Sequence, residues 1–123
     1  MLIDWSREFD QWLSSIEERG GRARRWTAAM LAELQDLEKR PTAESATYKR
    51  VRQARRHELW RVGHPFDDQV AVRIICWFPD ETTVVIALVL DKAKHGDVWY
   101  DSAATRSEAL VDQWLREHGQ EQP

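Results

Sequence analysis

Two arginines stand where apolar side chains are expected. Arg73 interrupts the apolar run 70–77, and Arg61 lies in the preceding run 58–62. A guanidinium inside a strand is costly unless it is paired or reaches water. If the turn between the runs centres on Asp67, the two arginines are cross-strand neighbours on one face. Like charges in that position repel, so the pattern favours a bound anion such as phosphate between them.

Two alternatives stay open for these arginines. Each could pair with a local acid, for which Glu58 is a candidate. A register shift of one residue would place Arg61 and Arg73 on opposite faces of the sheet and remove the argument.

A second group of reactive side chains follows an apolar run at 84–90. A lysine or histidine there could move a proton, and an aromatic ring could stack on a nucleobase. The candidates are Lys92, Lys94, His95 and Tyr100. The alternative is an ordinary charged turn in which Trp99 covers the core.

Positive charge is concentrated in one segment, although the whole chain carries a net charge of −3. Residues 47–61 hold six basic side chains and one acid, Glu58. The basic residues are Lys49, Arg50, Arg52, Arg55, Arg56 and Arg61. Positive charge gathered on one face can attract a polyanion despite a negative total. The alternative is a solvated, charged loop.

Several function classes lack their signatures. The single cysteine and four scattered histidines give no zinc-binding spacing, and no glycine-rich phosphate loop is present. We therefore expect neither metal nor cofactor. One cysteine allows no intramolecular disulfide, no signal peptide is visible, and the longest apolar run is too short for a membrane span. These features predict a cytoplasmic protein.

The elements that position these residues can be predicted from periodicity. Residues 2–5 suggest a strand, and apolar residues at helical spacing predict two helices, one ending at Gly20-Gly21 and one stopped by Pro41. This arrangement predicts a tight antiparallel helical hairpin. Three strands follow at 58–62, 70–78 and 82–90, the last buried on both faces. A final helix begins near 102–105, where Thr105 and Glu108 have capping-box spacing, and ends at Gly119.

These elements predict one α+β domain over residues 1–119, with a disordered tail at 120–123. The expected order is β-α-α-β-β-β-α. A small antiparallel β-sheet would carry the N-terminal helical hairpin on one face. The other face, or its rim, would be left for a site.

Taken in order, these motifs resemble the RelE/ParE superfamily of type II toxin–antitoxin systems, and most of all its HigB-like branch. The resemblance covers about residues 5–115. It rests on four segments, which are Glu58-Leu59-Trp60-Arg61, Arg73-Ile74-Ile75-Cys76-Trp77-Phe78, the run 84–90 leading into Asp91-Lys92-Ala93-Lys94, and Trp99-Tyr100. It implies the RelE-like fold and the activity of a ribosome-dependent mRNA endonuclease that needs no metal. It also implies an antitoxin partner, often of the helix-turn-helix type, and contact with DNA only through that antitoxin.

The resemblance also implies roles for the candidate residues. Arg73 matches the strand arginine that contacts the phosphate, and Arg61 matches the arginine of the preceding strand. The loop expected to transfer protons holds Lys92, Lys94 and His95, and Tyr100 would orient or stack on the nucleotide. The residues that would hold messenger and ribosomal RNA are Lys49, Arg50, Arg52, Arg55 and Arg56. Two alternatives share the fold, a ParE-like gyrase inhibitor and a catalytically inactive module that binds an antitoxin.

Overall fold

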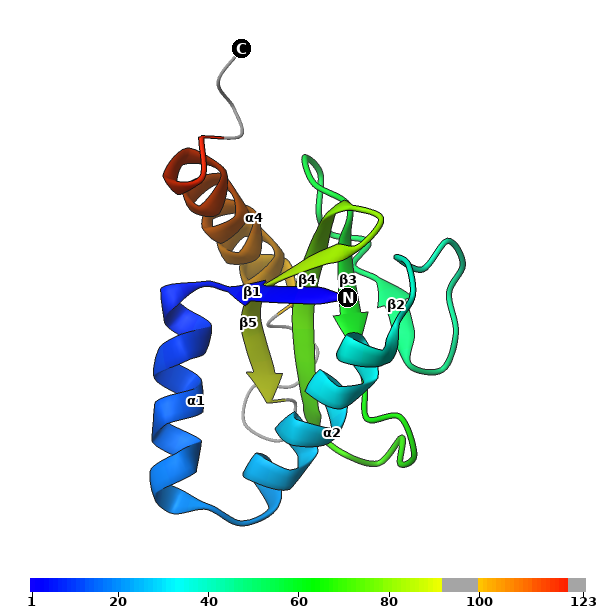
Figure 1. Cartoon of the computed structure of the whole chain (residues 1–123), viewed down its shortest axis with the longest axis vertical. Helices are drawn as coiled ribbons and strands as arrows, with labels where there is room; N and C mark the ends of the chain where they lie inside the picture. The colour runs from blue at the N-terminus through cyan, green and yellow to red at the C-terminus, as the bar shows by residue number, and fades with distance from the viewer. Residues whose placement is uncertain (92–99, 120–123) are drawn as a thin grey trace.

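The computed structural model describes residues 1–91 and 100–119. In chain order the elements are β1 (Leu2–Trp5), α1 (Arg7–Arg19), α2 (Arg22–Asp36), β2 (Tyr48–Arg50), β3 (Leu59–Val62), β4 (Val72–Asp80), β5 (Thr83–Asp91) and α4 (Tyr100–Glu117). The strands form one five-stranded sheet in the order β1-β5-β4-β3-β2 (Figure 1). The predicted α+β class is confirmed.

The sheet differs from the prediction in two respects. It is mixed, because β1 pairs with β5 in parallel, whereas β5, β4, β3 and β2 form an antiparallel meander. It also has an extra strand, β2, inside the segment expected to be a basic linker. Periodicity identifies a strand's exposed and buried faces but not its direction, and three residues are too few to show an alternation.

The N-terminal helices pack on one face of the sheet but do not form a tight hairpin. Ser6 caps α1 by accepting a hydrogen bond from the Phe9 amide, and the helix ends at Gly20. Gly20 and Gly21 have φ angles of 64° and 80°, which glycine adopts at little cost. From this corner the helices diverge in a V (Figure 1). Phe9, Met30 and Leu34 of these helices belong to the core that they share with the sheet.

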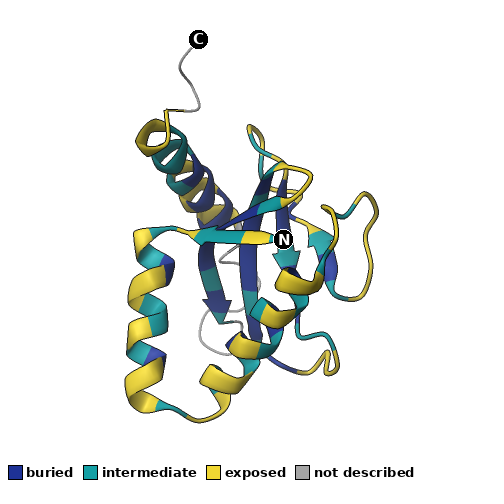
Figure 2. Ribbon diagram, in the orientation of Figure 1, coloured by how far each residue is buried: buried dark blue, intermediate teal, exposed yellow. Residues whose placement is uncertain are grey.

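The opposite face of the sheet is also covered by a helix, so of the two places expected for a site, this face or its rim, the part under the helix is excluded. Helix α4 packs on it through Ala103, Ala104 and Val111, which share a second core with Leu88 and Ile75. Figure 2 shows the buried side of α4 turned toward the strands. Only the parts of this face beyond α4 can hold an exposed site.

Strand β5 is buried on both faces, as predicted. Its register with β4 shifts at two places, and at the first Ile75 pairs with Leu88 whereas Cys76 pairs with Ile86, which leaves Ala87 as the extra residue of a bulge. The Ser6 hydroxyl donates to the Ala87 carbonyl, and the Ser6 amide donates to Ile86 O at 2.9 Å. The bulge therefore joins the start of α1 to the middle of β5.

Helix α4 begins at Tyr100, several residues before the predicted start, so Thr105 lies inside the helix and the expected capping box is wrong. The predicted loop residues Lys92, Lys94 and His95 and the tail at 120–123 lie outside the described residues. In the described part of the chain, no helix is long and apolar enough to cross a membrane.

Candidate phosphate-binding face

The cross-strand pair of like charges exists, but its partners differ from those expected. Arg61 pairs with Ile75, so it is not directly opposite Arg73 as a turn centred on Asp67 would require. Its neighbour on the other side is Lys49, directly opposite in β2. Because side chains two residues apart share a face, Arg73 lies diagonally from Arg61 on that same face. Lys49, Arg61 and Arg73 thus occupy one face of three adjacent strands.

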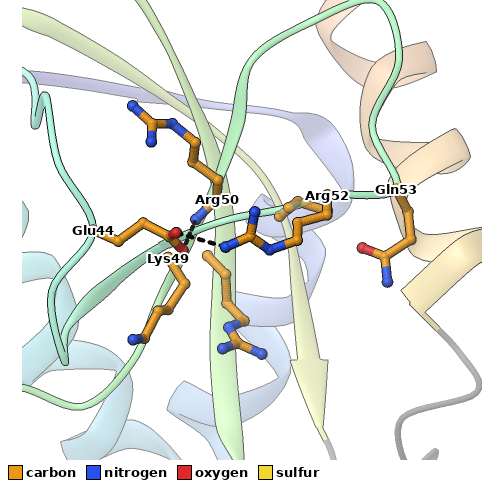
Figure 3. Close-up of a pocket in the computed structure, with 7 residues that line it drawn as sticks. Glu44, Lys49, Arg50, Arg52 and Gln53 are labelled. Carbon is orange, nitrogen blue, oxygen red and sulfur yellow. Dashed lines mark hydrogen bonds and ion pairs between the residues drawn. The ribbon is translucent and has the colours of Figure 1, made fainter.

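A surface pocket of about 400 Å³ opens over the β2 end of this row. Its lining residues are Glu44, Lys49, Arg50, Val51, Arg52, Gln53 and Arg61 (Figure 3). Lys49, Arg52 and Arg61 bring cationic side chains to the pocket and Glu44 brings a carboxylate. The pocket is therefore suited to an anion.

Glu44 neutralises part of this charge and holds the segment that follows β2. Its carboxylate accepts a hydrogen bond from the Arg50 amide at 3.1 Å and one from Arg52 Nη2 at 2.7 Å (Figure 3). The amide of Arg50, and secondarily the positive charges of Arg52 and Lys49, lower the pKa of Glu44. Arg52 is thereby held at the rim of the pocket.

The side chain of Arg50 lies on the opposite face of the sheet. Figure 3 shows the side chains of Lys49 and Arg50 leaving β2 in opposite directions. The guanidinium of Arg50 lies over the Trp60 ring, 4.8 Å from its centroid, and donates to Glu58 Oε1 and to the Thr42 carbonyl, both at 3.1 Å. Glu58, the local acid that the sequence offered as a partner, thus pairs with Arg50.

Arg55 and Arg56 lie, with His57, in a corner of the chain between β2 and β3 that is hydrogen-bonded to α4. The buried carboxylate of Glu108, 6% exposed, accepts the backbone N–H groups of Arg55, Arg56 and His57. Burial raises the pKa of Glu108, but these three hydrogen bonds outweigh it and the pKa is lowered. Glu108 stays ionised and fixes the path of the chain between β2 and β3.

One turn further along α4, Asp112 binds the side chains of the same corner. Its carboxylate lies 2.7 Å from Arg56 Nη1 and 2.8 Å from His57 Nε2. Burial raises the pKa of Asp112, but the hydrogen bonds from His57 and Arg56 lower it below its usual value. The His57 side chain is 16% exposed, and its ring packs edge-on against Trp77. This cluster was missed because nothing local to Glu108 or Asp112 marks a partner some fifty residues earlier.

Arg73 braces the loop between β3 and β4. Its guanidinium donates to the carbonyls of Val70, Val72 and Asp68, the last two at 3.0 and 3.4 Å. Its side chain lies beside Gly63, where a β-carbon would stand 3.5 Å from Arg73 Nε. Arg73 thus has a structural role that the sequence did not reveal, and its contact with phosphate stays a prediction.

The structure brings together only part of the predicted site. Lys49, Arg52 and Arg61 line one pocket, with Arg73 on the same face. Arg50, Arg55 and Arg56 have the other contacts described above. Tyr100 is the first residue of α4. No group of three or more potential metal ligands occurs within residues 1–91 and 100–119.

No protein-family model, curated protein or solved structure matches the chain.

Proposed function

We propose that this protein is a toxin of a type II toxin–antitoxin system, of the RelE/ParE superfamily and HigB-like, that cleaves mRNA on the ribosome in the cytoplasm. The observation that carries the proposal is the direct pairing of Lys49 with Arg61, with Arg73 on the same face. A helix-turn-helix antitoxin would be its restraining partner.

The energetic cost of this arrangement supports an anionic ligand. Like charges directly opposite in a sheet destabilise it by up to about 1 kcal/mol. A phosphate between Lys49 and Arg61 reverses the sign of that interaction, because each cation then faces a negative oxygen. The pocket beside the pair gives a phosphate access from solvent.

The cations suit the expected chemistry. The RNA 2′-oxygen loses its proton and attacks the adjacent phosphorus, the bond from phosphorus to the 5′-oxygen breaks, and that oxygen takes up a proton. A cyclic phosphate and a 5′-hydroxyl result. Lys49, Arg61 and Arg73 would stabilise the negative charge that develops on the phosphate oxygens. Lys92, Lys94 and His95 stay the proposed proton-transfer groups, with Tyr100 orienting the nucleotide.

The ion pairs of the basic segment favour one alternative, a module that binds its antitoxin and cuts nothing. Arg50, Arg52 and Arg56 each contact a carboxylate, which weakens their attraction for RNA. The proposed phosphate contacts are those of Lys49, Arg61 and Arg73.

Induced expression separates these possibilities. Wild type, Lys49→Gln, Arg61→Gln and Arg73→Ala are compared for growth, and a translated mRNA is mapped by primer extension. The control is Arg24→Gln, which removes a positive charge at an exposed position of α2. We expect arrest with new cleavages inside the reading frame for wild type and Arg24→Gln, and loss of both effects in the other variants.

Other outcomes would redirect the assignment. Growth arrest without mRNA cleavage would indicate that the toxin acts on another target, such as gyrase. Soluble wild-type protein that causes no arrest would favour the inactive antitoxin-binding module.

A further inference from the structure

The loop between β3 and β4 presents an aromatic ring to solvent. Phe66 is 88% exposed, more than any other large hydrophobic residue in the described part of the chain. The His64 ring meets it edge-on, with centroids 6.1 Å apart and an interplanar angle of 73°. The Phe66 amide also donates to His64 Nδ1 at 3.2 Å. A ring displayed in this way has a face open to a planar partner.

Hydrogen bonds give this loop a defined shape. Asp67 Oδ1 accepts the Gln69 amide at 2.9 Å, and Arg73 holds the carbonyls of Asp68 and Val70. Restraining the loop lowers the entropy lost when a ligand orders it. Phe66 is therefore carried on a braced loop.

The loop that carries the ring joins the two strands that hold Arg61 and Arg73. Gly63 leaves β3 two residues after Arg61, and Arg73 enters β4 beside it, so the loop starts and ends at two of the three candidate phosphate ligands. Proteins that bind single-stranded nucleic acid combine positive charge along the backbone path with aromatic side chains on which bases stack. The β3–β4 end of the sheet has both parts.

We infer that Phe66, positioned by His64, stacks on an unpaired base of a single-stranded RNA whose phosphates lie on Lys49 and Arg61. This rests on the proposed function and deepens it by assigning a base-stacking residue. A base inside a duplex is already stacked and cannot offer a face to Phe66, so the base must be unpaired.

Binding of two short probes to the full-length protein tests the inference. One is a fluorescently labelled 2′-O-methyl oligoribonucleotide, which cannot be cleaved through its 2′-oxygen, and the other has the same backbone without bases. Phe66→Leu keeps an apolar side chain but removes the ring, whereas Phe66→Tyr keeps the ring. We expect Phe66→Leu to bind the first probe about tenfold more weakly, as loss of one base stack implies, and Phe66→Tyr to bind like wild type.

The probe without bases makes the readout specific to stacking. Its affinity should not change in Phe66→Leu but should fall in Lys49→Gln and Arg61→Gln. A 2-aminopurine base in the first probe should be quenched by wild type and Phe66→Tyr, and less by Phe66→Leu.

Failure of the inference and failure of the proposed function give different results. If RNA binds through Lys49 and Arg61 but Phe66→Leu binds it normally, the stack is refuted and the phosphate face survives. Equal weakening of both probes by Phe66→Leu would also refute the stack. If wild type binds neither probe, both the inference and the RNA-binding face are refuted.

Discussion

The hydrogen bonds between Glu108 and residues 55–57 can be tested by measuring the stability of a variant that lacks the carboxylate. Glu108→Ala removes one buried carboxylate and deprives the amides of Arg55, Arg56 and His57 of their acceptor. A hydrogen bond to a charged group contributes about 1.5–3 kcal/mol. Arg55 and Arg56 are exposed, so water can replace part of what is lost. We therefore expect the free energy of unfolding to fall by about 2–4 kcal/mol, less than the sum of three bonds.

Urea denaturation followed by tryptophan fluorescence and circular dichroism measures this change. A loss of that size corresponds to about 8–16 °C in melting temperature for a chain of this length. The matched control is Glu117→Ala on the same helix, since Glu117 makes exposed contacts, an ion pair with Arg7 at 3.4 Å and a hydrogen bond accepted from Gln113 at 3.0 Å. Its removal should cost less than about 1 kcal/mol. Equal effects of the two substitutions would refute the reasoning.

The pH dependence of the same residue has a definite sign. The pKa of Glu108 is lower in the folded protein than in the unfolded chain, because the three amide bonds outweigh burial. Its contribution to stability is therefore complete above the unfolded pKa and is lost as pH falls through the folded one. Glu108→Gln cannot titrate, so its stability should fall less than that of wild type between pH 6 and pH 3. If the free energies of unfolding of wild type and Glu108→Gln changed equally with pH, Glu108 would not be ionised with a lowered pKa in the folded protein.

Two further predictions concern other parts of the molecule. Ser6→Ala removes both the cap of α1 and the bond to the bulge carbonyl of Ala87, and should lower the free energy of unfolding by about 1–2 kcal/mol in urea denaturation; a loss below a few tenths would show that water replaces both bonds. If three cations contact phosphates, the logarithm of the RNA association constant should fall with log salt at a slope of about −2, and Lys49→Gln should reduce that slope by about 0.7. An unchanged slope in titrations at several salt concentrations would remove Lys49 from the interface.

Local sequence patterns predicted the elements better than their assembly. Strands β3, β4 and β5 were expected because each is a run of apolar, often β-branched residues between turns, and the corner at Gly20 because two glycines end a helical stripe. Strand β2 was missed, because three residues that include Lys49 and Arg50 resemble a charged loop. The parallel direction of β1 depends on where the whole meander places β5, which no local pattern encodes.

For the candidate site too, the sequence predicted which residues matter better than it predicted which residues contact one another. Composition singled out the basic segment, and the sequence predicted a like-charge pair on the sheet. The β3–β4 register places Ile75 opposite Arg61 instead of Arg73, and the like charge comes from Lys49 of β2, a strand that was not predicted. A shift of two residues preserves the face and changes the partner. The contacts of Glu108 and Asp112 join α4 to a distant corner, so they could be found only from the fold.

The pairing of β1 with β5 has a consequence for the order of folding during synthesis. Leu2 bonds with residues around Thr83, and Ser6 with Ile86 and Ala87, so the first strand has no partner until β5 has left the ribosomal exit tunnel. Contacts between such distant segments form slowly, because a long loop must close before they stabilise the chain. A nascent chain that stops before Thr83 should therefore remain open to proteases. In the proposed toxin, this delay would keep the protein inactive until nearly all of its strands have been translated.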